Sequence, residues 1–335
     1  MKKKKQLIGC FAALLLSFLS NTVHAKDDHS LKLQSFADKM AKEHQFDGEE
    51  ILKTLQSLKV NKNIIAKMNR PAESLPWYRY RPIWMKDKRI SGGVDFYLKY
   101  KSVLERAEKQ YGVDKMMIVA IIGIESFYGS HQGTYPVLDA LYTLGFHYPK
   151  RSAFFKSELE QYFLLSRQQH WKLSDIKGSY AGAMGMGQFI SSSYRAYGVD
   201  FDQDGKIDLF NNPVDMIGSV ANYFKKHHWK KDQFVAKKIN LNNQQIKRWV
   251  QKDLQLLNRL SDLEKSGIVV EEMKDKDAKV AIFAFRQKDS DEHWLVASNF
   301  YSITRYNHNA MYALAALQLS DAIKENINQQ KMQNK

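Results

Sequence analysis

The chain has 335 residues, 44% of them hydrophobic and 26% charged, and its formal net charge is +15 at pH 7. This length allows two or three domains and a sizeable hydrophobic core. The chain contains one cysteine, Cys10, which excludes an internal disulfide. Because Cys10 lies in a segment that we expect to be removed, cysteine nucleophiles and thiolate metal sites are excluded as well.

Residues 1–25 have the pattern of a secretory signal peptide. A basic segment, Lys2 to Lys5, precedes an apolar segment from Gln6 to Ser20, and Val23-His24-Ala25 fits a small-residue cleavage site. The apolar segment is too short to span a membrane comfortably. We therefore expect an exported, soluble chain that starts at Lys26.

The residues around Cys10 permit a second interpretation. Leu7-Ile8-Gly9-Cys10 locally resembles a lipoprotein box, but the apolar run follows Cys10 instead of preceding it. Lipidation there would leave the run on the mature chain, so simple secretion is the favoured prediction. Loss of Lys2 to Lys5 leaves a net charge of +11. In an exported protein, this charge indicates an anionic partner such as cell wall or membrane phosphate rather than nucleic acid.

Helical patterns dominate the first part of the mature chain. Residues 30–70 predict short amphipathic helices, and Asp47 begins a capping-box pattern. A connector rich in proline and aromatic residues follows from Pro71 to Ile90, and helical periodicity returns from Asp95 to Tyr111. We expect a helical N-terminal domain over residues 26–90.

The most informative segment is an apolar helix that ends in a glutamate. All residues from Met117 to Ile124 are apolar or glycine, and Glu125 follows them. In a dry pocket such a carboxyl group stays protonated near neutrality, as a general acid requires. The C-terminal end of a helix from Val113 to Ser126 further disfavours its negative charge, and Gly129 is expected to stop that helix. The same pattern also fits a glutamate that reaches the surface where its helix ends.

Two further helices flank a glycine-rich segment. Ser152 is suited to cap a helix that continues to about His170, and Asn212 is suited to cap one through His227. Between them, residues 177–189 are rich in glycine, which permits tight turns and a close approach of a ligand to the backbone. A phosphate loop is excluded, because no Gly-Lys-Ser/Thr follows.

The composition changes over residues 231–297, which are polar and rich in lysine and glutamine. A helix is expected near Asn242 to Asp262, and three β-like runs follow it: Gly267 to Met273, Ala278 to Arg286 and His293 to Ala297. We interpret this segment as a small α+β insertion. Helical pattern returns from Asn309 to Lys324, and residues 326–335 are expected to form a frayed polar tail.

An acidic loop predicts a metal site. Its carboxylates occupy positions 1, 3, 5 and 9 of an EF-hand-like pattern that begins at Asp200, with Gly205 at the sharp turn. A standard EF-hand has glutamate at position 12, where this chain has Asn211. The nearest later carboxylate, Asp215, closes the coordination only if the loop is longer than usual; otherwise it stabilises the start of the next helix. The expected metal-site residues are Asp200, Asp202, Asp204, Lys206 and Asp215, and the expected ion is a structural Ca²⁺.

Aromatic and amide side chains suit the walls of a carbohydrate groove, where rings stack on sugar faces and amides bond hydroxyl or acetamido groups. The candidates are Tyr80, Tyr180, Tyr223, Tyr301, Tyr306, Gln188, Asn299 and Asn307. Taken singly, residues of these types more often belong to the core or to the plain surface.

A second catalytic carboxylate is not evident. Asp139 and Asp175 are the nearest candidates, but Asp139 fits a structural turn or helix start, and Asp175 lies among polar loop residues. The paired His227-His228 lacks a convincing third metal ligand, and no Ser-His-Asp arrangement is evident. The residues therefore favour a mechanism that rests on one acid.

Together, these segments resemble the lytic murein transglycosylase B family. The resemblance runs from about Pro76 to Ser320 and excludes most of residues 231–297. The matching segments are Trp77-Tyr78-Arg79-Tyr80-Arg81, Gly123-Ile124-Glu125-Ser126, Leu138-Asp139-Ala140-Leu141, Gly178-Ser179-Tyr180-Ala181-Gly182-Ala183-Met184-Gly185, Gln188-Phe189, Ile217-Gly218-Ser219-Val220-Ala221-Asn222-Tyr223-Phe224 and Asn299-Phe300-Tyr301-Ser302-Ile303-Thr304-Arg305-Tyr306-Asn307.

The resemblance implies a mainly α (α+β) fold. Its lysozyme-like helical core is expected over residues 91–230 and 298–325, beside the helical N-terminal domain and the β-containing insertion. It also implies cleavage of the β-1,4 bond between N-acetylmuramic acid and N-acetylglucosamine without water. Glu125 matches the sole acid/base, which protonates the leaving oxygen and then takes the proton of the muramoyl C6 hydroxyl. Attack of that hydroxyl on C1 leaves a 1,6-anhydro end, and the substrate acetamido group replaces a second carboxylate.

By motif position, the resemblance assigns a saccharide groove to Tyr80, Ser179, Met184, Gln188, Tyr223, Tyr301, Tyr306 and Asn307. The acidic loop matches the EF-hand-like metal site of the family, with an extra residue before Pro213 that bears on the contact from Asp215. No organic cofactor is implied. Many relatives are lipoproteins, and the signal peptide of this chain departs from that pattern.

The implied partners are glycan strands of peptidoglycan in the periplasm, and proteins of cell-wall synthesis or division are further candidates. No nucleic acid is expected, and the chain is expected to be a monomer. A hydrolytic muramidase is the alternative within enzymes, and a non-catalytic peptidoglycan-binding protein is the alternative from another class.

Overall fold

The computed structural model describes residues 28–69, 75–240 and 246–333. The expected signal peptide, Cys10 and the cleavage site lie outside these residues, as does the start of the connector at Pro71. Within the described ranges, no helix combines the length and the apolar character needed to cross a membrane.

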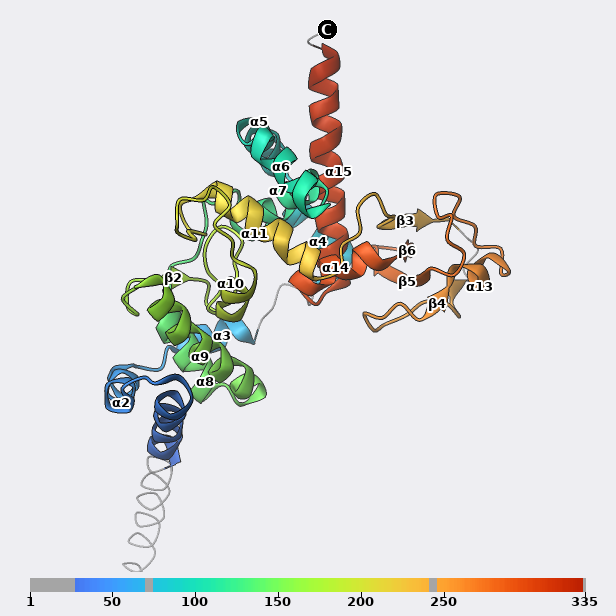
Figure 1. The fold of residues 1–335 in the computed structure, drawn as a ribbon. Helices are drawn as coiled ribbons and strands as arrows, with labels where there is room; N and C mark the ends of the chain where they lie inside the picture. The colour runs from blue at the N-terminus through green and yellow to red at the C-terminus, as the bar shows by residue number, and fades with distance from the viewer. Residues whose placement is uncertain (1–27, 70–74, 241–245, 334–335) are drawn as a thin grey trace, which may run out of the picture. The chain divides into compact units, whose positions relative to one another are not determined.

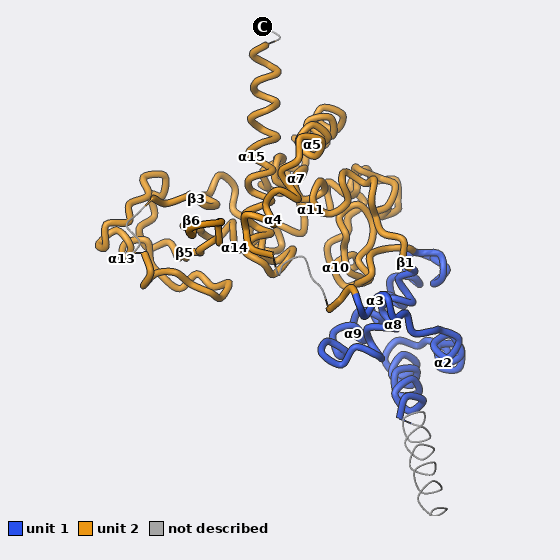
Figure 2. Tube along the Cα trace, turned by 180° about the vertical axis from the view of Figure 1, so that it is seen from behind, with its two compact units in different colours: residues 1–66, 136–176 blue, residues 67–135, 177–335 orange. Residues whose placement is uncertain are grey.

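The chain forms two compact units (Figure 2). Unit 1 comprises residues 1–66 and 136–176, and unit 2 comprises residues 67–135 and 177–335. This division differs from the expected boundaries, because residues 136–176 join the N-terminal helices and residues 75–90 belong to the other unit. The two-residue strands β1 (Tyr135–Pro136) and β2 (Lys177–Gly178) stand where the chain passes between the units.

Unit 1 is helical. Its elements are a helix over residues 28–44, α2 (Gly48–Ser57), the first residues of α3 (Lys62–Met68), α8 (Val137–His147), the short 3-10 helix η2 (Pro149–Arg151) and α9 (Ser152–Gln169). The side chain of Asp47 caps α2 by accepting the N–H groups of Glu49 and Glu50. The antiparallel pair α8 and α9 buries Leu141 and Leu159 in the core of this unit.

Outside the insertion, unit 2 is mainly helical, and several of its helices pack around α7 (Figure 1). Its main helices there are α4 (Trp77–Trp84), α5 (Asp87–Lys99), α6 (Lys101–Tyr111), α7 (Lys115–Ser126), α10 (Ser191–Tyr197), α11 (Pro213–Lys226), α14 (Ser298–Tyr306) and α15 (Ala310–Gln333). Because α5, α6, α11 and α15 all pack against α7, every residue from Met116 to Ile124 is buried. This packing explains a helix that is apolar on all sides.

The insertion contains a four-stranded antiparallel sheet of order β3-β6-β5-β4. Its strands are β3 (Ala236–Ile239), β4 (Asn258–Arg259), β5 (Lys279–Arg286) and β6 (Asp291–Val296), and Trp294 of β6 lies opposite Phe283 of β5. The sheet and α13 (Leu260–Glu264) enclose a separate hydrophobic cluster that includes Ile246, Leu260, Val280 and Leu295.

Three expectations about elements were wrong. Residues 247–257, expected to be helical, form turns and irregular chain, and the end of the expected helix falls in α13; residues 242–245 of that expectation lie outside the described residues. The run from Gly267 to Met273 is turn and irregular chain instead of a strand. Its strand-like pattern arises because the apolar residues Ile268, Val270 and Met273 are buried in the hydrophobic cluster of the insertion. Helix α15 continues to Gln333 instead of fraying after residue 325, and it buries Ile327.

Candidate active site

Glu125 is the penultimate residue of α7 and is half-buried. Its Oε1 accepts a hydrogen bond of 2.5 Å from the phenol of Tyr312, which is 3% exposed and comes from α15. Burial, followed by the charge of Glu125, raises the pKa of Tyr312 well above its usual value. The phenol therefore stays protonated and serves as a donor to the carboxylate.

A tight turn follows Glu125. Ser126 Oγ donates to the carbonyl oxygen of Met186 at 2.6 Å and accepts the N–H of Gly129 at 2.9 Å. The helix ends at Phe127, whose φ is 51°, before Gly129 is reached. The expectation that Gly129 stops the helix was therefore wrong by two residues, because Phe127 itself takes the left-handed conformation.

The glycine-rich segment folds back on itself beside this turn. Met184 is fully buried and bridges both Gly178 and Phe189 in antiparallel fashion. Gly185 has a φ of 69°, and a Cβ there would lie 2.4 Å from the carbonyl oxygen of Leu209, so only glycine fits. Because its side chain is fully buried, Met184 belongs to the interior of unit 2.

Two polar candidates hold the backbone of the same segment. Ser179 Oγ accepts the N–H groups of Ala181 and Ala183 at 3.3 and 3.1 Å. The amide of Gln188 donates to the carbonyl oxygens of Gln132 and Gly185 at 3.1 and 2.9 Å. Both residues are half-buried, so they also present surface to a ligand.

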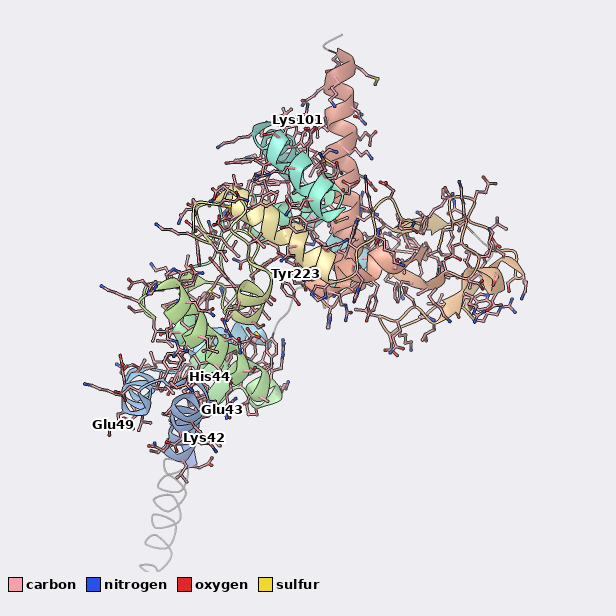
Figure 3. The ribbon with its side chains drawn as sticks, in the orientation of Figure 1. Lys42, Glu43, His44, Glu49, Lys101 and Tyr223 are labelled. Atoms are coloured by element: carbon pink, nitrogen blue, oxygen red, sulfur yellow. The ribbon has the colours of Figure 1, made fainter. Side chains whose placement is uncertain are left out.

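Tyr223 and Tyr306 form an aromatic wall near Glu125. Their ring centroids are 4.7 Å apart, and Tyr306 donates to the carbonyl oxygen of Gly187 at 2.7 Å. Tyr223, labelled in Figure 3, donates to the carbonyl oxygen of Arg305 at 2.5 Å. Burial raises the pKa of both phenols, and the charge of Glu125 adds to the rise in each.

The other groove candidates differ in their surroundings. Tyr80 is buried between Trp77 and Trp84, with ring centroids 6.2 and 5.8 Å away, and its phenol also influences Tyr312. Tyr301 is half-buried, and the guanidinium of Arg305 lies 4.2 Å from its ring centroid. Asn307 is the half-buried residue that ends α14. Asn299, in contrast, is fully buried and bonds the backbone of Lys230.

The acidic loop brings three carboxylates together. Oxygen atoms of Asp200, Asp202 and Asp204 lie within 4.8 Å of one another. The oxygens of Asp200 also accept the N–H groups of Asp204 at 3.1 Å and Gly205 at 2.8 Å. Oxygen donors clustered in this way suit a hard cation such as Ca²⁺.

Asp215 braces this loop from α11. It is fully buried, and its two oxygens accept the N–H groups of Phe201 and Asp208 at 2.8 and 2.9 Å. Asn212 caps the same helix and also donates to Asp202 at 2.7 Å. The carboxylate of Asp215 thus ties the two ends of the loop together through the backbone.

The two carboxylates considered as partners for Glu125, Asp139 and Asp175, belong to unit 1, whereas Glu125 belongs to unit 2. Sequence reasoning missed Tyr312. Its signal in the sequence is a single tyrosine in the apolar first half of α15.

Comparison with known proteins decides the family. A family model described as "Transglycosylase SLT domain" matches residues 28–321. The membrane-bound lytic murein transglycosylase B of Escherichia coli (strain K12) is 37% identical over 300 residues, which cover 87% of this chain and 82% of that protein. The chain belongs to the transglycosylase SLT family.

Solved structures of this family have the same lysozyme-like fold. The soluble lytic transglycosylase SltB1 from Pseudomonas aeruginosa is 41% identical, with a TM-score of 0.83, and the match covers 89% of this chain and 99% of that chain. The Escherichia coli transglycosylase Slt35 in complex with calcium is 37% identical, with a TM-score of 0.79 and coverage of 88% and 93%. SltB3 from Pseudomonas aeruginosa, in complex with NAG-NAM-pentapeptide, is 25% identical, with a TM-score of 0.74 and coverage of 88% and 79%.

Proposed function

We propose that this transglycosylase cleaves the β-1,4 bond between N-acetylmuramic acid and N-acetylglucosamine in peptidoglycan, with Glu125 as its single acid/base. The names of its relatives support the reaction class. The observation that carries the role of Glu125 is the 2.5 Å bond from Tyr312 at the end of the buried helix α7. A hydrogen bond of this kind fixes the orientation of the carboxyl group.

The reaction needs two proton transfers at the same carboxyl group. Glu125 as the acid gives its proton to the glycosidic oxygen while the bond from that oxygen to C1 of the muramoyl residue breaks. The resulting carboxylate takes the proton of the muramoyl C6 hydroxyl, whose oxygen forms the new bond to C1. No water is consumed, the product has a 1,6-anhydro end, and Glu125 is protonated again. The substrate acetamido group stabilises the cationic centre between these steps, as in other substrate-assisted glycosidases.

We propose that the saccharide groove is formed by Tyr80, Ser179, Met184, Gln188, Tyr223, Tyr301, Tyr306 and Asn307, either at its surface or by packing directly behind it. Tyr223 and Tyr306 are the best supported, because the charge of Glu125 acts on both phenols. Ser179 and Gln188 are supported by their half-buried positions on the glycine-rich segment. The contributions of Met184 and Tyr80 are packing behind the groove, since both are buried.

A hydrolytic muramidase is the second candidate, because it requires the same acid at the same bond. Mass spectrometry of digested peptidoglycan separates the two reactions. Anhydromuramoyl ends support transglycosylation, whereas reducing ends, heavier by one water, would establish hydrolysis.

The acidic loop supports a structural Ca²⁺ site in residues 200–215. The carboxylates of Asp200, Asp202 and Asp204 would hold the ion, and the backbone carbonyl oxygen of Lys206 would be a further ligand. Asp215 would complete the loop through its bonds to Phe201 and Asp208. The ion would keep the segment before α11 in place, and it has no part in the proton transfers.

The signal-peptide pattern and the charge of +11 support export to the periplasm, cleavage near Ala25 and work on an anionic polymer. We propose a soluble, monomeric enzyme that meets peptidoglycan strands there. Labelling with a lipid precursor distinguishes this form from one anchored through Cys10.

A further inference from the structure

The turn after Glu125 has an unusual backbone. Phe127, Tyr128 and Gly129 have φ values of 51°, 59° and 91°, so three successive residues are left-handed. Two of them carry side chains that disfavour this conformation. Such a conformation persists only where its surroundings hold it in place, and it is concentrated at functional sites.

The ring of Tyr128 is held in a slot made by three glycines. A Cβ at Gly92 would lie 3.0 Å from this ring, one at Gly93 would lie 2.6 Å from its hydroxyl, and one at Gly123 would lie 2.5 Å from it. Gly92 and Gly93 belong to α5, and Gly123 belongs to α7. Any larger residue in the slot would therefore displace the Tyr128 ring and the turn that carries it.

Arg89 closes this arrangement. The hydroxyl of Tyr128 donates to the carbonyl oxygen of Arg89 at 2.7 Å, and the guanidinium of Arg89 donates in turn to the carbonyl oxygen of Gly123. That guanidinium also lies 5.1 Å from the ring centroid of Phe127 and 5.2 Å from that of Trp84. Burial of the guanidinium lowers the pKa of Arg89.

The residues on either side of Glu125 are thus anchored to two different parts of unit 2. Gly123 and Tyr128 are tied to α5 through Arg89, and Ser126 is tied to the glycine-rich segment through Met186. Glu125 lies between these anchors. A cation at the carbonyl end of α7 also offsets the negative end of the helix dipole, next to a carboxyl group that must become negative during the reaction.

We infer that Arg89 and Tyr128 form a clamp that positions Glu125 for proton transfer. Both are positioning residues, because Tyr128 bonds the backbone of Arg89 and Arg89 bonds the backbone of Gly123, so each acts through the turn or the end of α7. The inference rests on the proposed role of Glu125. It goes beyond that role because it states what orients the acid: the contact between Arg89 of α5 and the end of α7.

The test compares Tyr128→Phe, Arg89→Met and Arg89→Lys with native enzyme on a soluble peptidoglycan tetrasaccharide. A misplaced catalytic group costs rate rather than affinity, so we expect kcat to fall about tenfold in Tyr128→Phe and about hundredfold in Arg89→Met, with KM within about twofold of native. Arg89→Lys keeps the charge and one donor, and it should recover part of the loss. Tyr162→Phe is the matched control, since Tyr162 is buried in unit 1 and donates to the carbonyl oxygen of Leu173 at 2.7 Å.

The measurements are made below the melting temperature of each variant, with folding checked by circular dichroism. If kcat of Tyr128→Phe and Arg89→Met stays within twofold of native, the clamp does not position the acid and the inference is wrong. A kcat loss in Tyr162→Phe equal to that in Tyr128→Phe would also overturn it, because general destabilisation would then explain both. Glu125→Gln is assayed in parallel, since activity in that variant would refute the proposed function whatever the clamp variants do.

Discussion

Tyr312 places a phenol 2.5 Å from Oε1 of Glu125, in a position that is almost closed to water. A hydrogen bond to a charged group is stronger than one between neutral groups, and this one stabilises the carboxylate that forms after the first proton transfer. Burial and the charge of the same carboxylate also raise the pKa of the Tyr306 and Tyr223 phenols. At the residue scale, the site is therefore one carboxyl group among buried phenols.

We predict that Tyr312→Phe lowers kcat while the protein stays folded. Loss of a charge-assisted hydrogen bond costs about 2 kcal/mol, which corresponds to a roughly thirtyfold slower reaction. The assay measures initial rates on the soluble tetrasaccharide, with Tyr162→Phe as the control for loss of a buried phenol. An unchanged kcat in Tyr312→Phe would mean that this bond has no part in the reaction.

At the scale of elements, the acidic loop and α11 form one unit of structure. Asp200, Asp202 and Asp204 gather at the loop, and Asp215 fixes its ends to the first turn of α11. We predict that Ca²⁺ raises the melting temperature and that a chelator lowers it. Binding to the folded state alone adds about 2.7 kcal/mol at a ligand concentration of 100 Kd.

The calcium prediction is checked by thermal unfolding with and without the ion. Asp204→Asn removes one charge from the cluster and should reduce the response, whereas Asp289→Asn, at an exposed site in the insertion, should leave it intact. A melting temperature of the native chain that is insensitive to both Ca²⁺ and chelator would exclude the structural ion.

Unit 1 depends on an ion-pair cluster between the helix over residues 28–44 and α9. Glu160 is 9% exposed and contacts Lys39 at 2.6 Å and His44 at 2.8 Å; His44 is labelled in Figure 3. Burial tends to raise the pKa of Glu160, but the bonds from Lys39 and His44 outweigh it and lower that pKa below its usual value of 4.5. A lowered pKa in the folded state adds stability above the unfolded value, and that stability is lost as the pH falls through the folded value.

We therefore predict that Glu160→Gln destabilises unit 1 at pH 7, by roughly 1–2 kcal/mol for the lost charged hydrogen bonds. The difference from native should shrink as the pH falls below about 4.5, because native Glu160 then loses its charge. Melting curves across pH 3 to 8 measure this, with Glu49→Gln, at an exposed position of α2 outside this cluster, as the control. A difference that does not depend on pH would contradict the assignment.

The sequence predicted correctly those elements that depend on a local pattern, such as a helix-capping residue or a continuous apolar run. Asp47 and Asn212 cap their helices as expected, and the apolar run before Glu125 is a buried helix. The strand expected from Gly267 was wrong because alternating burial also arises in irregular chain around a cluster. Tyr312 and Arg89 were not predicted, because contacts between α15, α5 and α7 depend on packing between distant segments that no local pattern records.

At the scale of the whole molecule, the candidate site residues all belong to one of the two units. Unit 2 contains Glu125, the phenols, the glycine-rich segment and the acidic loop, whereas unit 1 contributes a helical body with its own core. The boundaries of these units could not be read from the sequence, because residues 136–176 belong to unit 1 although residues 67–135, which precede them, belong to unit 2. The family pattern covers both units, since the matched region runs from 28 to 321.

The central claim is that Glu125 alone carries the proton transfers of a reaction that consumes no water. Product analysis by mass spectrometry on purified peptidoglycan tests it most directly, with native enzyme, Glu125→Gln and Glu105→Gln, an exposed glutamate on α6, as the control. We predict 1,6-anhydromuramoyl ends from the native enzyme and from Glu105→Gln, and a loss of at least about a hundredfold in Glu125→Gln. Reducing ends from the native enzyme, or anhydro ends formed at the native rate by Glu125→Gln, would contradict the claim.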